Sequence, residues 1–109
     1  MKADQFGLRQ SDLKNIVEIL EQFDTINEAV LFGSRAKGNY KHGSDVDIAL
    51  KGNVDFRTII RLSYLLNQES LMPYKFDLVN YSHTEHKDLK DHIDRVGVPI
   101  YHKTFLISA

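Results

Sequence analysis

The sequence has no cysteine and no tryptophan, and only two of its 109 residues are proline. The absence of cysteine excludes disulfides, thiolate zinc sites and a cysteine nucleophile. No apolar run approaches the roughly 18 residues that a membrane-spanning helix needs, and the polar N-terminus lacks the hydrophobic stretch of a secretory signal. We therefore expect a cytoplasmic protein that has no membrane partner.

An excess of charge of one sign is absent too. Lys and Arg total 14, Asp and Glu total 15, and the formal net charge is -1, so strong nucleic-acid binding through a basic surface is not expected. Apolar residues make up 42% and charged residues 27% of the chain, which is typical of a globular fold. The length fits one domain over residues 1–109, in which residues 1–10 are polar and are expected to be loosely held.

Apolar spacing predicts the elements of the first half of the chain. Helical spacing of apolar residues after Ser11 indicates a helix that this serine caps. A short apolar run at residues 29–32 indicates a buried strand, and residues 34–37 fit a single helical turn. Alternation over residues 45–50 is typical of a strand with one apolar face. The link over residues 33–44 is too short for a crossover helix, so the two strands are expected to be antiparallel or splayed.

The second half continues this alternation of helices and strands. Asp55 is expected to cap a second helix, and residues 75–81 to form a third strand. Ser82 and Glu85 fit a capping box for a third helix. A short edge strand is expected at residues 99–102. The predicted fold class is therefore α/β (α+β), with a small mixed β-sheet flanked by helices.

Two carboxylates lie close together on the second predicted strand. Asp45 and Asp47 are two residues apart, so both side chains point to one face. At a separation of ~6 Å and an effective dielectric near 20, two carboxylates repel by about 3 kcal/mol. Protonation of one acid, a basic neighbour or a divalent cation would relieve this repulsion. Mg²⁺ suits carboxylate oxygens and keeps water and phosphates as its other ligands.

A third acid and a glycine–serine turn complete the candidate site. Asp77 lies in an apolar run, where a charge is unusual unless it is paired or bound to metal, and it meets the other acids if the two strands pair in register. Gly33 lets the backbone approach a ligand, and Ser34 opens a helical turn that can hold phosphate oxygens. Arg35 and Lys37 add positive charge, although either can simply face solvent. Together these residues predict phosphoryl transfer with two metal ions.

The pattern of Gly33-Ser34, ten residues, then Asp45-Val46-Asp47 resembles the defining motif of the polymerase-beta-type nucleotidyltransferase superfamily. The stretch LFGSRAKG…SDVDIAL resembles its minimal nucleotidyltransferase (MNT) branch, and the resemblance covers residues ~11–102. It implies a polymerase-beta-like fold, in which a short mixed sheet is flanked by helices. It also implies Mg²⁺-dependent transfer of a nucleoside monophosphate from a nucleoside triphosphate, expected to be ATP, to an acceptor hydroxyl.

The resemblance further implies roles for six residues. The acids that it makes catalytic residues and ligands of two Mg²⁺ ions are Asp45, Asp47 and Asp77. The residues that it makes nucleotide-binding are Gly33, Ser34 and Arg35, of which Arg35 matches a less fixed basic position.

Minimal members of this branch commonly act with a separate helical HEPN-type protein, often as the antitoxin of a toxin–antitoxin pair. Some of them transfer AMP from ATP to that toxin. The chain lacks the further helical domain of larger family members, so we expect a partner protein as acceptor, an activity that can require this partner, and a hetero-oligomer or homodimer.

Several alternatives stay open at this stage. The chain can instead be a nucleotide-binding antitoxin that acts by occlusion of a helical partner, or an enzyme that modifies a small molecule. Residues 59–72 carry apolar side chains around much of the predicted helix, which serve the core, a partner helix, or both. Tyr40 and His42 are expected to be ordinary loop residues, with contact to a base or acceptor as the alternative. The five histidines are not expected to form a zinc site.

Overall fold

Four strands form one mixed sheet. The structure is a computed structural model and describes residues 2–104. β1 (Ile26–Phe32) pairs antiparallel with β2 (Val46–Gly52) and with β4 (Val98–His102), and β2 pairs parallel with β3 (Phe76–Asn80). The strand order is β3-β2-β1-β4. The predicted mixed sheet, its antiparallel first pair and its C-terminal edge strand are therefore confirmed.

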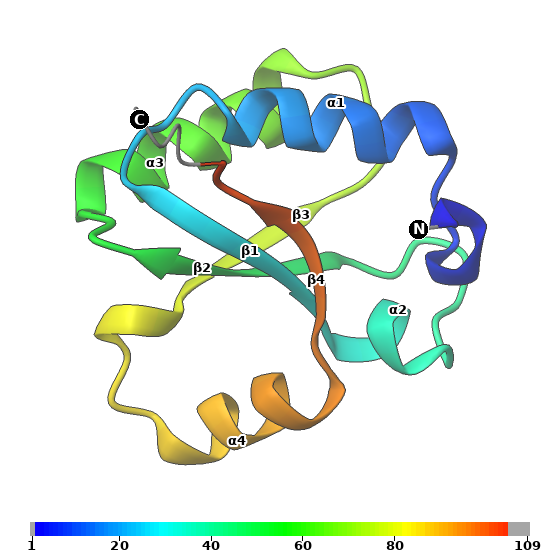
Figure 1. Ribbon diagram of the computed structural model, residues 1–109. Coiled ribbons are helices and arrows are strands. Elements are labelled where there is room, and N and C mark those ends of the chain that lie inside the picture. Colours follow the sequence, from blue (N-terminus) through cyan, green and yellow to red (C-terminus); the bar gives the residue numbers. More distant parts are fainter. Residues whose placement is uncertain (1, 105–109) are drawn as a thin grey trace.

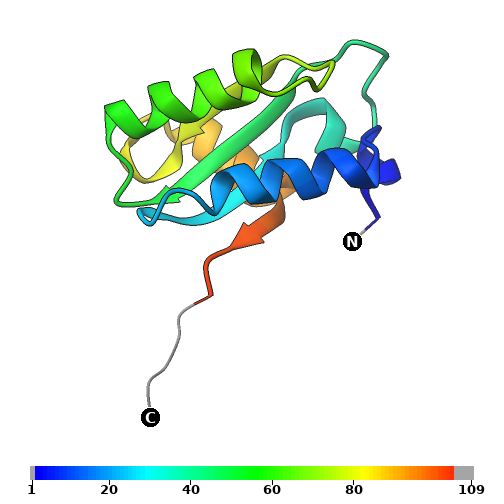
Figure 2. The ribbon, with the colours of Figure 1, turned by 90° about the horizontal axis from the view of Figure 1, so that it is seen from above.

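Helices cover both faces of this sheet (Figure 1). α1 (Gln10–Leu20) and α3 (Phe56–Tyr64), which continues into a π-helical turn at Leu65–Glu69, lie on one face (Figure 2). α2 (Gly33–Lys37) and α4 (Lys87–Val96) lie on the other side. Two short 3₁₀ helices occupy Ala3–Phe6 and Tyr81–His83. No helix within residues 2–104 is long and apolar enough to cross a membrane.

The alternation of side chains along β1 and β2 divides the core into two layers. Leu31 and Ile48 are fully buried in the larger cluster, which includes α1 and α3. Val30 and Ala49 belong to the smaller cluster, which α4 completes. Because successive residues of a strand point to opposite faces, Asp47 lies on the α4 side of β2.

The first helix begins differently from the prediction. Ser11 lies inside α1, and the N-cap residue is Arg9. The Arg9 amide donates a hydrogen bond to the Asp12 carboxylate at 3.0 Å. Asp12 thus satisfies the amide of the N-cap residue, and the helix begins without the serine cap that we expected.

The third predicted helix also has a different start. Residues 81–83 form a 3₁₀ turn instead of a capping box at Ser82 and Glu85. α4 begins at Lys87, and the His86 imidazole accepts from the Leu89 amide at 3.1 Å. The predicted cap of α3 is confirmed, because the Asp55 carboxylate accepts from the Thr58 amide at 2.8 Å.

The N-terminal segment packs against the rest of the fold. Ala3, Phe6 and Leu8 are buried in the larger core cluster. The Phe6 and Gly7 carbonyls accept hydrogen bonds from Arg35 of α2. Residues 2–10 are therefore packed and not loosely held as expected. The segment is polar on average, but its three apolar side chains are buried in the core.

Candidate active site

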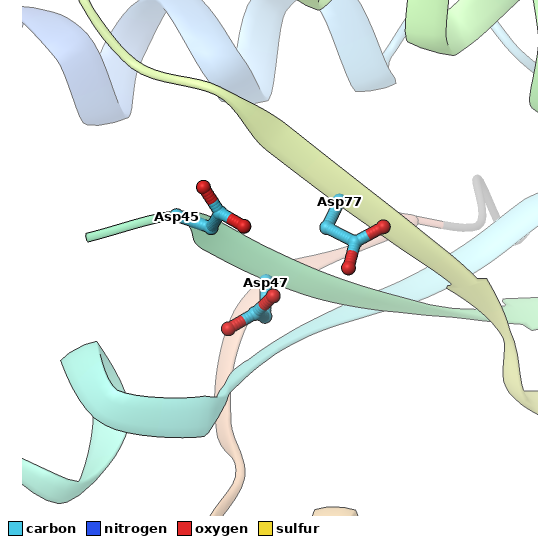
Figure 3. Close-up of side chains that lie close together, drawn as sticks. All are labelled: Asp45, Asp47 and Asp77. Carbon is cyan, nitrogen blue, oxygen red and sulfur yellow. The ribbon is translucent and has the colours of Figure 1, made fainter. Parts of the chain in front are cut away.

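Three carboxylates converge at one end of the sheet. Asp47 of β2 lies opposite Asp77 of β3 in the parallel register, and Asp45 comes one residue before β2 begins. One carboxylate oxygen of each acid lies within 4.8 Å of those of the other two (Figure 3). Asp45 and Asp47 are half-buried and Asp77 is exposed. The predicted convergence of the three acids is confirmed.

The cluster disfavours full ionisation of its central acid. The pKa of Asp47 is raised from 3.8 to about 6, first by burial and then by the charges of Asp77 and Asp45, while the Arg35 charge opposes the rise. Like charges and loss of solvent both favour the neutral form of a carboxyl. A cation held between the three acids would reverse this effect and keep Asp47 ionised.

The chemistry of the donor set fits magnesium. All three ligands are carboxylate oxygens, which hard divalent cations prefer, and the set leaves positions for water or phosphate. Among residues 2–104, the three acids are the only group of at least three potential metal ligands that lie close enough together to share one ion. No histidine belongs to this group.

Gly33 brings the backbone of α2 directly against the central acid. It follows β1 with a φ of 73°, in the left-handed region. A Cβ atom at this position would collide with the Asp47 carboxylate. Glycine is therefore needed both for the turn and for the close approach of the backbone to the site.

Ser34 is the next residue and lies in the single helical turn that the sequence predicted. α2 spans Gly33–Lys37 and ends at Gly38, which adopts a φ of 84°. The Ser34 hydroxyl has no hydrogen-bond partner within residues 2–104, so it is available for a ligand.

Arg35 lies beneath this turn, and its exposed fraction is 3%. Its Nε and Nη2 atoms donate to the Ser44 carbonyl at 3.1 and 2.8 Å, and Nη1 donates to the Phe6 and Gly7 carbonyls at 2.9 and 3.2 Å. The guanidinium thus ties the N-terminal segment to the residue that precedes Asp45. Direct contact between Arg35 and a nucleotide stays a prediction.

Two aromatic rings enclose the Arg35 guanidinium. Its Cζ atom lies 5.5 Å from the centre of the Tyr40 ring and 5.1 Å from that of Tyr74. The Tyr74 hydroxyl in turn donates to the buried Asp12 carboxylate at 2.6 Å. Tyr40 therefore packs on Arg35 in the present structure, while His42 is exposed. The sequence analysis did not identify Asp12 and Tyr74, because their contact joins residues 62 apart.

The exposed cation of α2 is Lys37. It stands on the same helical turn as Ser34, whereas the neighbouring arginine is enclosed by carbonyls and rings. The sequence predicted that Arg35 and Lys37 both add positive charge near the site, and it left open which of them faces solvent. In the folded chain, Lys37 is exposed and can contact a ligand without losing buried partners, whereas Arg35 cannot.

Comparison with known proteins identifies relatives of nearly the whole chain. Residues 14–105 match the family model described as Polymerase beta, Nucleotidyltransferase. Over 101 residues the chain is 32% identical to the probable protein adenylyltransferase MntA of Haemophilus influenzae, which covers 91% of this chain and 87% of that protein.

Solved structures with the same fold come from toxin–antitoxin complexes. A chain of a toxin–antitoxin complex with AMP-PNP gives a TM-score of 0.71 at 21% identity, covering 84% of this chain and 74% of that one. A chain of the complex between the tri-AMPylated HEPN toxin of Shewanella oneidensis and its MNT antitoxin gives 0.65 at 20% identity, covering 86% and 72%. These similarities confirm the predicted polymerase-beta-like fold.

Proposed function

The chain belongs to the polymerase beta nucleotidyltransferase family, and from this we propose that it transfers AMP from ATP to a hydroxyl group of a partner protein. The Haemophilus influenzae relative is named a probable protein adenylyltransferase, and one similar structure contains an AMPylated HEPN toxin. The partner that we propose is accordingly a HEPN-type toxin, with this chain as its antitoxin. Both proteins and ATP would meet in the cytoplasm.

The convergence of the three acids is the observation that carries this proposal. Asp45, Asp47 and Asp77 offer a set of carboxylate oxygens that would hold Mg²⁺, and two ions are what we propose. When bound, Mg²⁺ neutralises charge on the triphosphate and on the pyrophosphate that leaves. Asp77 is the most exposed of the three, so it can also accept the proton of the incoming hydroxyl.

The residues of α2 would hold the nucleotide beside these acids. The acceptor oxygen attacks the α-phosphorus of ATP, and the bond from that phosphorus to the bridging oxygen of the leaving pyrophosphate breaks. The hydroxyl proton passes to Asp77. Gly33 and the free Ser34 hydroxyl bind phosphate oxygens, and Lys37 adds a positive charge. Arg35 acts through its charge and through the loop that it holds.

A transfer assay tests this function. ATP labelled at the α-phosphate is incubated with Mg²⁺, the chain and the HEPN-type protein encoded beside its gene. We expect the label to move to the partner, and Asp45→Asn to lower the rate by roughly a hundredfold or more, because an essential charge at the reacting centre is lost. Asp91→Asn is the matched control, since Asp91 is an exposed carboxyl on α4. Equal labelling by the Asp45 variant, or the absence of such a partner gene, contradicts the proposal.

A second candidate function is neutralisation of the partner by occlusion alone. Exposed apolar side chains on α3 favour it, because they offer a protein-binding surface that needs no chemistry. A variant with Asp45→Asn and Asp77→Asn separates the two functions when it is produced together with the toxin. Retained protection of the cells supports occlusion, and lost protection with retained binding supports AMP transfer.

A further inference from the structure

The outer face of α3 exposes a row of large apolar side chains. Phe56, Ile60 and Tyr64 are 76%, 53% and 53% exposed. Their spacing of four residues places them in one line along the helix. The opposite face of the same helical segment supplies Leu62 and Leu66, both fully buried, to the core. The chain's own packing therefore leaves more than half of each residue in this row, which we call the α3 stripe, uncovered.

A groove runs beside the α3 stripe. It has a volume of about 630 Å³, and Ile60 and Tyr64 line one side while residues 72–75 line the other. The floor is firmly fixed, because the Asn67 side chain accepts from the Phe76 amide at 2.8 Å and donates to the Phe76 carbonyl at 3.1 Å. The lining mixes apolar side chains with the polar Ser63, Asn67, Gln68 and Lys75. An open groove of this kind along a helix suits an incoming amphipathic helix.

Positive charge borders the N-terminal part of the stripe. Arg57 and Arg61 are exposed next to Phe56 and Ile60, and neither forms an ion pair within residues 2–104. The Asp55 carboxylate accepts from the Thr58 amide, and this bond, together with the smaller effect of the Arg57 charge, lowers its pKa. Asp55 therefore offsets part of the Arg57 charge, and Arg61 remains without such a neighbour in sequence. A matching surface must therefore carry apolar side chains bordered by carboxylates.

The charge pattern argues against a second copy of this chain as the occupant. Two α3 stripes packed in parallel would bring the same arginines toward one another, and the stripe itself carries no carboxylate to meet them. Like charges facing across an interface cost affinity. A different protein with acidic residues avoids this cost.

The groove also lies close to the candidate active site along the chain. It ends at Lys75, two residues before Asp77. β3, which begins directly after the groove and carries Asp77, is one of the two edge strands of the sheet. The acids point to the α4 side of the sheet and α3 covers the other face, so a protein seated in the groove must extend past the β3 edge to reach the exposed acid.

We infer that the α3 stripe and its groove dock an amphipathic helix of the HEPN-type partner, whose apolar side chains are bordered by carboxylates. This inference rests on the proposed function and specifies the surface on which the acceptor protein is held. The stripe supplies apolar anchors, and the two arginines set the direction and the choice of the partner helix.

Binding of the HEPN-type protein encoded beside the gene tests the inference by calorimetry. Ile60→Glu should weaken binding at least roughly tenfold, because it places a carboxylate in the centre of the apolar row. Arg57→Glu with Arg61→Glu should weaken it as well and flatten its dependence on salt. Lys14→Glu on α1 is the matched control, because its side chain is exposed and lies outside the stripe and the groove.

A second measurement separates the inference from the proposed function. All variants should bind AMP-PNP with Mg²⁺ as the unaltered chain does, which also shows that they fold. If the unaltered chain binds the partner and Ile60→Glu binds it equally well, the docking surface is wrong while the function stands. If the unaltered chain does not bind the partner, both fail. Sedimentation that shows dimers of the chain alone, broken by Ile60→Glu, makes a second copy the occupant and overturns the inference.

Discussion

The folded chain favours a protonated Asp47, whereas the proposed function needs Asp47 ionised. Its pKa is raised to about 6 by burial and by the neighbouring acids, so the folded protein holds a proton that the unfolded chain releases near pH 4. Without metal, the free energy of unfolding should therefore fall as the pH rises from about 4 through about 6, and stay low at neutral pH.

Asp47→Asn should remove this pH dependence. At pH 7 the variant should be more stable than the unaltered chain by roughly 1–2 kcal/mol, a value reduced for the partial exposure of the side chain. Urea unfolding at pH 4, 5, 6 and 7 without Mg²⁺ measures the effect. Asp91→Asn on α4 should leave the pH profile unchanged, and a profile for Asp47→Asn that matches the unaltered chain refutes the assigned cause.

Comparing alanine variants of Gly33 and Gly38 separates the effect of backbone strain in the turn from the effect of crowding the candidate site. Both have positive φ angles, 73° and 84°, so alanine at either position costs about 1 kcal/mol of backbone strain. Only at Gly33 does the added Cβ meet the Asp47 carboxylate, whereas Gly38 faces open space.

We expect Gly33→Ala to abolish Mg²⁺-dependent AMP-PNP binding and Gly38→Ala to retain it. Both should unfold at lower urea concentrations, with Gly33→Ala the less stable. Calorimetric titration of AMP-PNP gives the comparison. Equal nucleotide binding by the two variants would mean that Gly33 serves the turn and not the site.

Single residues of the site were largely predictable from sequence, but their relation across strands was not. The period of two predicts Asp45 and Asp47 on one face once the segment is extended. Asp77 joins them only because β3 pairs with β2 in one register, and a slip of one residue would turn it to the opposite face. That register depends on the packing of Phe76 into the core.

At the scale of elements, the contacts of Arg35 stabilise α2, because the helix is too short to be stable by itself. The helix has five residues, too few to be stable alone. Arg35 joins it to the loop before β2 and to the N-terminal segment through three carbonyls. The geometry of the candidate phosphate-binding turn therefore depends on this one buried cation.

Arg35→Met should destabilise the protein by about 3 kcal/mol or more, because it removes the donors of three carbonyls and a buried charge held between two rings. Arg95→Met, an exposed arginine on α4, should change stability by no more than about 0.5 kcal/mol. Urea unfolding at pH 7 measures both. A loss at Arg35 as small as at Arg95 would show that water replaces the guanidinium without cost.

Sequence patterns predicted which elements exist better than how they are joined. The helices and strands follow from apolar spacing, and the cap at Asp55 follows from its position before an apolar run. The caps at Arg9 and His86 were missed, because each depends on the path of the preceding loop. The role of Arg35 was equally hidden, since two of its acceptors lie 28 and 29 residues away.

At the scale of the whole molecule, the acid cluster couples metal binding to folding. Only the folded chain brings the three carboxylates within reach of one ion, so Mg²⁺ should raise the free energy of unfolding. At a concentration ten times the dissociation constant, the gain is about 1.4 kcal/mol.

Thermal unfolding at pH 7 with increasing MgCl₂ measures this coupling, with NaCl of equal ionic strength to account for screening. The midpoint should rise for the unaltered chain and stay constant for Asp45→Asn with Asp77→Asn. A rise of the same size in NaCl would indicate relief of repulsion by ionic atmosphere and not a bound ion.

The parallel pairing of β2 with β3 has a kinetic consequence. Asp47 lies in β2, and Asp45 directly before it, and β2 pairs with β1, its neighbour in sequence. Asp77 joins them only after β3, which follows α3 in the chain, has paired with β2. Contacts between segments so distant in sequence form late on the folding route. Bound Mg²⁺ should therefore slow unfolding many-fold and leave the folding rate almost unchanged.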